Sequence, residues 1–264
     1  METKELERIS QVLTRVKRLA KTDMKAKVVT KNNFPKATGI ASSASGLSAV
    51  TVATCTALGL KLSQKELSKL ARLASGTAAR SIPDGFVEWE KGSNEANSYA
   101  KQIFPADYWK IRDVVAIVSH KMKKVKSTQG HALADTSPFQ RVRLKGMPAR
   151  IRAIKQAIKQ RDFNRFGQIL EAECLSMHAV CLTSQPPILY WEATTMEIMR
   201  QVQAWRDQGL ESYFTIDAGP TVHVICKQRD TRRLLSRLRK ISGIERLSIN
   251  APGQGARVVQ EPLF

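Results

Sequence analysis

The alternation of apolar and polar positions predicts a chain of mixed helices and strands. An amphipathic helix opens the sequence, with an apolar stripe formed by Ile9, Val12, Leu13, Val16 and Leu19. Residues 26–30 alternate apolar and polar positions, which predicts a strand, and the apolar, proline-free stretch 47–58 predicts a buried helix. Ser63 and Glu66 form a capping box that begins a further helix, and a short strand is expected over residues 85–89.

The second half of the chain shows the same two periodicities. Strands are predicted over 113–119, 213–216, 222–226 and 244–249. Helices are predicted over 148–158 and 163–177, and a third begins after a cap at Thr194 and Thr195. A further, basic helix is predicted after the strand at 222–226. The pattern changes near residue 110. We therefore expect an α+β protein of two domains, residues 1–110 and 111–264, with a two-helix, split-sheet arrangement in the second.

The composition is ordinary for a globular protein except in its charge. Hydrophobic residues make up 42% of the 264 residues and charged residues 25%. No apolar run approaches the length of a membrane span, and the acidic first residues are not typical of a signal peptide. The four cysteines lack metal-ligand spacing and indicate a reducing cytoplasm. The net charge of +20 makes polyanions candidate partners, but too few aromatic residues alternate with the basic ones to favour a nucleic acid.

A loop of small residues lies between the predicted strand at 26–30 and the predicted helix at 47–58. It contains Gly39, Ile40, Ala41, Ser42, Ser43, Ala44 and Ser45. Small side chains let an anion reach backbone N–H groups, and the following helix directs its unpaired N–H groups and the positive end of its dipole to the same point. A phosphate is the simplest ligand for this geometry. A loop that only permits close helix packing is the alternative, because the spacing matches neither a Walker loop nor a dinucleotide fingerprint.

Asp217 and Arg80 are the strongest candidates for chemistry. Asp217 follows a predicted strand and precedes Ala-Gly-Pro, so a sharp turn could present its carboxylate to a hydroxyl that attacks phosphorus. A carboxylate that merely caps the turn is the alternative, and the residues alone favour it. Arg80 could bind a carboxylate or phosphate through two parallel hydrogen bonds, or satisfy the last carbonyls of a helix. Thr136 and Ser137 could donate to a ligand or form a turn, and His178 is best explained as a satisfied core or surface histidine, since no metal-ligand spacing surrounds it.

Several motifs, in order along the chain, resemble one family. Residues 32–46 contain Asn-Asn-Phe-Pro and Gly-Ile-Ala-Ser-Ser-Ala-Ser-Gly, which resemble the phosphate loop of the small-molecule kinases that include galactokinase, homoserine kinase and mevalonate kinase. They are closer still to the diphosphomevalonate decarboxylase family. Residues 75–81 and 85–89 resemble that family's Ser-Gly-Ser-Ala-Cys-Arg-Ser and Gly-Gly-Phe-Val-Glu-Trp signature. Residues 213–220, Tyr-Phe-Thr-Ile-Asp-Ala-Gly-Pro, resemble the segment that carries the family's catalytic aspartate.

The resemblance implies an ATP-dependent carboxy-lyase of the mevalonate pathway with the two-domain fold of the small-molecule kinase superfamily, its second domain a ferredoxin-like split α/β sandwich. ATP, assisted by Mg²⁺, would phosphorylate the 3-hydroxyl of (R)-5-diphosphomevalonate, and loss of phosphate and carbon dioxide would give isopentenyl diphosphate. Asp217 would orient or deprotonate the hydroxyl, Arg80 would hold the substrate carboxylate, and residues 39–45 would hold the ATP phosphates. The substrate-binding residues would be Ser75, Gly76, Thr77, Ala78, Ala79, Arg80, Thr136 and Ser137. No residue is assigned as a metal ligand.

The chain departs from the family pattern in two places. Thr77 and Ala79 stand where the family has Ser and Cys. The family's N-terminal segment, with a Lys-Tyr-Trp-Gly-Lys block that contacts the substrate, has no counterpart here, so we expect an incomplete first domain. The chain is then expected to be weakly active alone, or to work with an N-terminal half supplied in trans, as a cytoplasmic homodimer. The alternatives are a phosphomevalonate decarboxylase, a mevalonate 3-kinase, or a basic binding protein that kept the fold without the catalysis.

Overall fold

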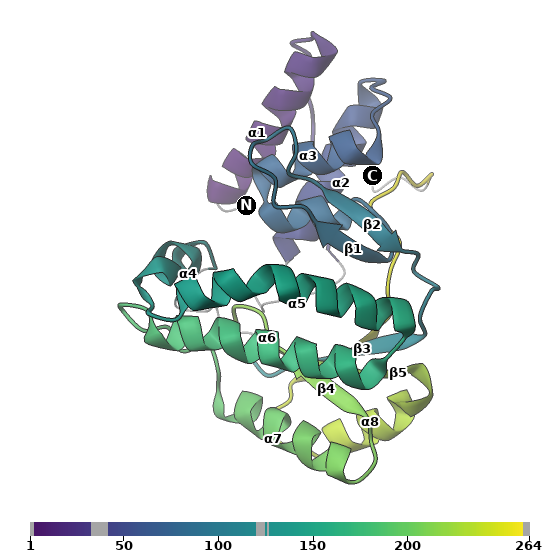
Figure 1. Ribbon diagram of the computed structural model, residues 1–264. Coiled ribbons are helices and arrows are strands. Elements are labelled where there is room, and N and C mark those ends of the chain that lie inside the picture. The colour runs from purple at the N-terminus through teal and green to yellow at the C-terminus, as the bar shows by residue number, and fades with distance from the viewer. Residues whose placement is uncertain (1–2, 33–41, 120–124, 126, 261–264) are drawn as a thin grey trace. The chain divides into compact units, whose positions relative to one another are not determined.

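The computed structural model describes residues 3–32, 42–119, 125 and 127–260 (Figure 1). These residues form two compact units. The first is built from the described residues of Met1–Lys36, Ala41–Tyr108 and Pro252–Phe264, and the second from those of Trp109–Ala251. Each unit has its own hydrophobic core, so each is described by itself.

Three helices enclose the core of the first unit, namely α1 (Thr3–Ala20), α2 (Ser42–Ala57) and α3 (Gln64–Ala74). Val16, Cys55 and Ala71 are buried where these helices pack together. The predicted capping box is confirmed, because the Glu66 N–H donates to Ser63 Oγ over 3.3 Å and the Ser63 N–H donates to the Glu66 carboxylate over 2.7 Å. These two bonds satisfy N–H groups that the first turn of α3 would otherwise leave unpaired.

Two predictions for the first unit are wrong. Residues 26–30 do not form a strand. An alternating pattern becomes a strand only when its backbone groups find a partner, and no described residue forms a ladder with this stretch. Helix α2 begins at Ser42 rather than at residue 47, so residues 42–46 are helical and not part of a loop. Alanine and serine allow this extension, and the single Gly46 costs only about 1 kcal/mol relative to alanine.

A short 3₁₀ helix and a hairpin follow α3. The 3₁₀ helix η1 spans Gly76–Ser81, and β1 (Phe86–Trp89) pairs antiparallel with β2 (Ala100–Phe104). The predicted strand at 85–89 is confirmed, whereas β2 was not predicted. Gly76 lies directly against the Trp89 ring, since a Cβ at this position would approach the ring to 2.7 Å.

The stretch after residue 251 also belongs to the first unit. The Gly85 N–H donates to the Gly253 carbonyl over 2.8 Å, and the Ala256 N–H donates to the Ser81 carbonyl over 2.8 Å. The turn that follows η1 is therefore hydrogen-bonded to residues far along the chain.

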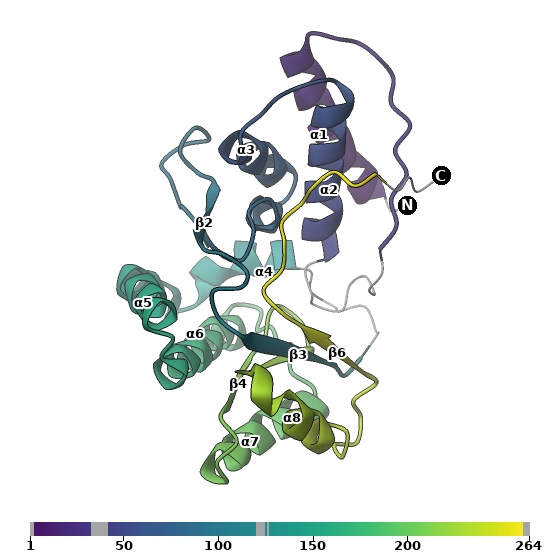
Figure 2. The same cartoon turned by 90° about the vertical axis from the view of Figure 1, so that its right-hand side faces the viewer.

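The second unit contains an antiparallel sheet in the order β4-β5-β3-β6. Its strands are β3 (Ile111–Ile117), β4 (Ser212–Thr215), β5 (Val222–Lys227) and β6 (Arg246–Asn250). Helices α7 (Ala193–Asp207) and α8 (Thr231–Leu238) cover one face of this sheet (Figure 2). Val114, Phe214 and Val224 point into the core between them and are fully buried. The four strands and the basic helix are confirmed, although their ends differ by one or two residues from the prediction.

Two long helices, α5 (Gln140–Gln160) and α6 (Phe163–Thr183), lie side by side in the second unit (Figure 1). Helix α5 begins eight residues before the predicted start at Pro148, which lies in its interior. An ion pair from Arg143 to Glu173 of α6 holds the additional turns, and Arg150, inside the predicted range, pairs with the same carboxylate. Helix α4 (Ser127–Leu133) and the 3₁₀ turns η2 (Ala134–Thr136) and η3 (Gln228–Asp230) were not predicted.

Candidate functional site

Asp217 lies at the exposed end of a buried strand. Strand β4 ends at Thr215, Ile216 is buried, and Asp217 is exposed in the turn that follows. The Gly219 N–H donates to the backbone carbonyl of Asp217 over 2.8 Å. Within the described part of the chain, no hydrogen bond or ion pair engages the Asp217 carboxylate. The turn is thus closed by backbone groups, and the carboxylate does not cap it.

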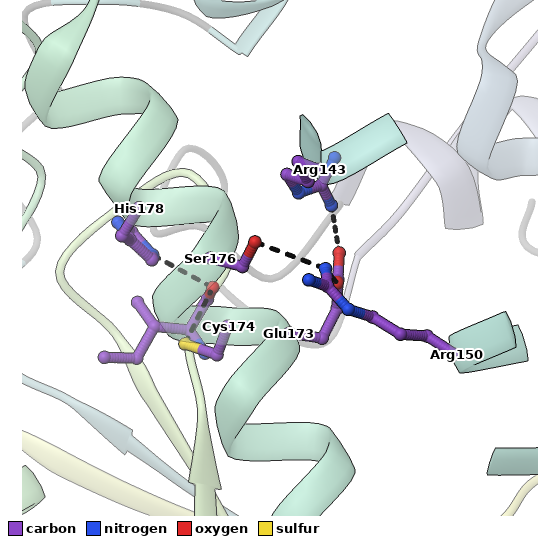
Figure 3. Close-up of polar contacts among 7 residues, drawn as sticks. Arg143, Arg150, Glu173, Cys174, Ser176 and His178 are labelled. Carbon is purple, nitrogen blue, oxygen red and sulfur yellow. Dashed lines mark hydrogen bonds and ion pairs between the residues drawn. The ribbon is translucent and has the colours of Figure 1, made fainter. Parts of the chain in front are cut away.

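Helix α6 holds the backbone on the N-terminal side of Asp217 through two side chains, His178 and Cys174, which lie on the same side of the helix in Figure 3. His178 is 1% exposed, and its Nε2 lies 3.1 Å from the Ile216 carbonyl oxygen. Cys174, one turn earlier on the same face, accepts a hydrogen bond from the Ile216 N–H at 3.2 Å. Burial lowers the pKa of His178, and the Ile216 hydrogen bond and the negative charge of Asp217 oppose this shift only in part. The ring is therefore neutral at pH 7 and donates from Nε2 to the carbonyl.

Helix α7 holds the other side of the same turn. Thr195 is fully buried, and its Oγ1 donates to the Pro220 carbonyl over 2.8 Å. The same oxygen accepts from the Glu192 N–H at 3.1 Å. Glu192, and not the predicted Thr194 and Thr195, is the N-cap of α7, and Thr195 completes its capping box. Residues 217–219 therefore run between two fixed points, one provided by each helix.

A buried ion pair fixes β4 itself. Glu171 of α6 accepts hydrogen bonds from both terminal nitrogens of Arg206, at 2.6 and 3.0 Å, and from the Phe214 N–H at 3.1 Å. Arg206 also donates to the Ser212 carbonyl over 2.8 Å, and its guanidinium lies 4.6 Å from the centre of the Tyr213 ring. The buried Glu171 carboxylate and the partly exposed Arg206 guanidinium are thus each compensated by several partners, which a stable pair of this kind requires.

A histidine–aspartate pair lies on the sheet next to β4. His223 of β5 faces Thr215 across the ladder, and its Nδ1 lies 2.9 Å from Asp113 Oδ2 of β3. Burial alone would lower the pKa of His223. The hydrogen bond and charge of Asp113, aided by the charge of Asp217, outweigh burial, so the pKa is raised. No described residue bonds to Nε2 of His223.

Arg80 lies near the end of η1 in the first unit. It is exposed, and no described residue makes a hydrogen bond or ion pair with its guanidinium. It therefore does not satisfy the carbonyls of the preceding helical turn. On the same segment Ser75 Oγ and Thr77 Oγ1 lie 3.1 Å apart, whereas Ala78 and Ala79 are fully buried. The segment thus combines two hydroxyls and one unengaged cation.

The predicted phosphate loop is described only in part. Gly39, Ile40 and Ala41 lie outside the described residues. Ser42, Ser43, Ala44 and Ser45 form the first turn of α2, where backbone N–H groups have no partner within the helix. This turn carries no acidic residue, so the positive end of the helix dipole is not neutralised within it. Ser43 and Ser45 are exposed, and Ala44 is buried.

Thr136 and Ser137 use their hydroxyls within the second unit. Thr136 Oγ1 donates to the Leu133 carbonyl over 2.6 Å and accepts from the Gln185 N–H at 2.8 Å. Ser137 is buried, with its Oγ 2.6 Å from Thr183 Oγ1. These contacts are those of a turn that is tied to α6, and the substrate-binding role of both residues stays a prediction.

The structure gathers Cys174, His178 and Thr195 around the turn that carries Asp217, and sequence reasoning did not foresee this group. The four-residue spacing of Cys174 and His178, which puts both on one helix face, is the only signal of it in the sequence. Arg80 and the start of α2 belong to the other unit. Among the described residues, no group of three or more His, Cys, Asp or Glu side chains could hold a metal ion. None of the described helices is both long enough and apolar enough to cross a membrane.

Comparison with family models decides the relationship of this chain to known proteins. The diphosphomevalonate decarboxylase-like N-terminal domain matches residues 1–100, and the mevalonate 5-diphosphate decarboxylase C-terminal domain matches residues 113–255. The chain belongs to the diphosphomevalonate decarboxylase family. Diphosphomevalonate decarboxylase of Candida albicans is 37% identical over 227 residues, which are 84% of this chain and 63% of that protein. The chain thus spans less than two thirds of this curated member of the family.

Solved structures of the diphosphomevalonate decarboxylase family confirm the predicted fold. The crystal structure of mevalonate diphosphate decarboxylase from Staphylococcus aureus has a TM-score of 0.90 at 34% identity, over 97% of this chain and 78% of that one. The structure of MDDEF in complex with MVAPP, AMPPCP and magnesium has a TM-score of 0.88 at 36% identity, over 97% of this chain and 79% of that one. The α+β architecture expected from the motifs is therefore correct.

Proposed function

We propose that this chain carries out the ATP-dependent decarboxylation of (R)-5-diphosphomevalonate to isopentenyl diphosphate. The observation that carries the proposal is the Asp217 carboxylate, exposed and unengaged among the described residues, at the end of a strand whose backbone is held on both sides. Membership of the family supports the reaction type. The related MDDEF structure, which contains MVAPP, AMPPCP and magnesium, supports the substrate and the nucleotide.

Asp217 is proposed to orient the 3-hydroxyl of the substrate and to accept its proton as the oxygen attacks the γ-phosphorus of ATP. A carboxylate in this role contributes about 10²–10⁴-fold to the rate. ADP leaves in that step, and the 3-phosphate then leaves as inorganic phosphate. The electron pair of the bond to the carboxylate forms the new carbon–carbon double bond, and carbon dioxide is released. Phosphoryl transfer depends on positioning and on charge stabilisation, which suits a carboxylate fixed in this way.

Arg80 is proposed to hold the substrate carboxylate, since its exposed guanidinium can form two parallel hydrogen bonds with it. The neighbouring Ser75, Gly76, Thr77, Ala78 and Ala79 would line the substrate, together with Thr136 and Ser137. In this proposal, domain 1–110 binds the nucleotide and most of the substrate. Domain 111–264 presents the catalytic carboxylate.

The ATP phosphates are proposed to bind at residues 39–45. The unpaired N–H groups and the dipole at the start of α2 suit an anion there. Magnesium would be brought with the nucleotide and would neutralise charge on its phosphates. Because Mg²⁺ keeps several water ligands and uses phosphate oxygens with only one or two carboxylates, it does not require a cluster of protein ligands.

A cytoplasmic location and assembly as a homodimer stay predictions. All four cysteines are free thiols, which fits a reducing compartment. Exposed apolar side chains near α5, at Phe139, Val142 and Leu144, are suitable for an interface between copies. Light scattering at micromolar concentration tests for the dimer.

A segment supplied in trans to the first unit also stays a prediction. It is supported by the stretch 26–30, which has the alternation of a strand and forms no ladder with any described residue. Phosphate release is measured for the chain alone and with a polypeptide of the family's N-terminal segment added. We expect a clear gain on addition, and an equal rate with and without the polypeptide would overturn this prediction.

The proposed function is tested by the release of inorganic phosphate from ATP on addition of diphosphomevalonate, with Asp217→Asn as the variant. The matched control is Asp207→Asn, because Asp207 is also exposed but lies at the end of α7. We expect Asp217→Asn to lower turnover about 10²–10⁴-fold and Asp207→Asn to leave it nearly unchanged. Equal turnover by Asp217→Asn would remove Asp217 from the reaction. The same assay with the monophosphate and with mevalonate distinguishes the decarboxylase from its two enzymatic alternatives.

A further inference from the structure

We propose that His178, assisted by Cys174 and Thr195, is a positioning residue that sets the orientation of Asp217. This inference rests on the proposed function, because it concerns the delivery of the carboxylate to the substrate. None of the three side chains is proposed to touch substrate. Each contacts the backbone that flanks Asp217, and each is buried on a helix that packs against the sheet.

The hydrogen bond from His178 acts directly on the Asp217 backbone. The carbonyl of Ile216 and the N–H of Asp217 belong to one peptide unit, which is rigid and planar. A donor that fixes this carbonyl therefore fixes the direction in which the Asp217 Cα leaves the strand. The Ile216 N–H donates a second bond to Cys174 Sγ at 3.2 Å, so both polar backbone groups of Ile216 are held by α6.

The His178 ring is itself held in place. Its centre lies 4.8 Å from the centre of the Trp191 ring, and Tyr190 approaches at 6.2 Å nearly edge-on. On the opposite side of α6, Arg150 of α5 donates to Glu173 over 2.6 Å and to Ser176 over 3.2 Å (Figure 3). Helix α6 is thus anchored to α5 at the same turns from which Cys174 and His178 reach toward Ile216.

The neutral state of His178 also matters for Asp217. A charged imidazole here would attract the Asp217 carboxylate and compete with the substrate hydroxyl for it. Burial disfavours that charge. The ring therefore supplies a hydrogen bond to the backbone without an opposing charge beside the carboxylate.

Thr195 completes the arrangement on the far side of the turn. Its bond to the Pro220 carbonyl leaves only residues 217–219 between the two anchored positions. The Gly219 N–H, which donates to Asp217, closes this short turn. Displacement of a catalytic group by about 1 Å can cost on the order of 10²-fold in rate, so both anchors are expected to affect turnover.

The first test does not require turnover. Hydrogen exchange is measured at the Gly219 amide in the full chain, in His178→Leu, in His178→Gln, and in Val180→Ala as a control. Val180 is buried on the same helix, and within the described part of the chain no hydrogen bond or ion pair joins it to the turn. We expect His178→Leu to speed exchange at Gly219 at least tenfold relative to Val180→Ala. The Gln variant keeps an amide donor and should restore slow exchange. Equal exchange in His178→Leu and Val180→Ala would overturn the inference.

The second test is kinetic and uses the same variants. We expect His178→Leu to lower kcat about 10–100-fold with little change in KM, and His178→Gln to recover most of that loss. If His178 had only a structural role, His178→Leu and Val180→Ala would lose the same active fraction when compared at equal loss of unfolding free energy. Unchanged kcat in His178→Leu would overturn the positioning role while Asp217→Asn remained inactive. Full turnover by Asp217→Asn would instead refute the proposed function, and the exchange measurement would still decide whether His178 orders the turn.

Discussion

Replacing Arg206 with methionine tests how strongly the buried ion pair holds β4. The Glu171 side chain is only 11% exposed, and Arg206 supplies two of its three hydrogen bonds. Methionine fills similar space but leaves the carboxylate with the Phe214 N–H alone. Removal of one partner from a buried pair costs about 3–5 kcal/mol, because the remaining charge is uncompensated. We expect a loss of unfolding free energy in this range.

The opposite replacement, Glu171→Gln, is expected to cost less. Its amide oxygen still accepts from Phe214, and the Arg206 side chain, 23% exposed, can turn toward water. The loss is then about 1.5–3 kcal/mol, as for a single hydrogen bond to a charged group. The difference between the two variants reports that the carboxylate, and not the guanidinium, is the more deeply buried charge.

Calorimetric unfolding measures both losses. For a chain of this size a loss of 1 kcal/mol lowers the melting temperature by about 2–4 °C, so Arg206→Met should lower it by roughly 6–20 °C. The double variant, Arg206→Met with Glu171→Gln, completes a double-mutant cycle. It should lose less unfolding free energy than the sum of the two single losses, because it leaves no buried charge without a partner. A loss below about 1 kcal/mol in Arg206→Met, or equal losses in the two single variants, would refute the reasoning.

Two further predictions concern other parts of the chain. Gly76→Ala should displace the Trp89 ring, lower the free energy of unfolding by about 1–3 kcal/mol and change the tryptophan fluorescence. Gly46→Ala, whose Cβ meets nothing within 4 Å, should instead stabilise α2 by about 0.5–1 kcal/mol. Equal effects of the two changes would contradict this prediction. In an NMR titration His223 should keep its proton to a higher pH than a free histidine, and Asp113→Asn should lower its midpoint. Because the folded-state pKa is raised, the stabilisation from this pair is fully present below a pH of about 6.5 and is lost as the pH rises through the folded value; a midpoint that Asp113→Asn does not move would refute this.

The elements that were predicted correctly are those fixed by neighbours in sequence. The start of α3 depends on Ser63 and Glu66, which are three residues apart, and the stripe that includes Val16 needs only one helix to be recognised. The strands β4 and β5 could also be recognised, because their apolar residues lie on both faces of a sheet that is largely buried. Local patterns of this kind carry the information for the fold class.

The features that were missed depend on distant partners. Residues 26–30 alternate as a strand should, but a strand also requires a ladder, which no local pattern reveals. The start of α5 was misplaced because Pro148 is a typical first-turn residue, while the ion pair of Arg143 that holds the earlier turns reaches across to another helix.

The candidate site also contains both kinds of residue, those that local sequence marks and those that depend on distant partners. Asp217 could be singled out because it follows a predicted strand and precedes Ala-Gly-Pro, but only the family resemblance implied a catalytic role, which stays a proposal. His178 was recognised as a satisfied histidine, but its partner Ile216 lies 38 residues away. The supporting contacts of a site are therefore the part that only a three-dimensional structure supplies.

The hydrogen bonds between residues 81–85 and 253–256 have a consequence for biosynthesis. The Gly255 N–H reaches the Asp84 carboxylate across a separation of 171 residues, so residue 255 must have left the ribosome before this contact can form. Residues 81–85 can therefore complete these hydrogen bonds only after residues 253–256 have been synthesised. A protease cut near residue 252 would leave β6, which ends at Asn250, in the four-stranded sheet, so the stability lost after such a cut would report on the contacts of residues 81–85.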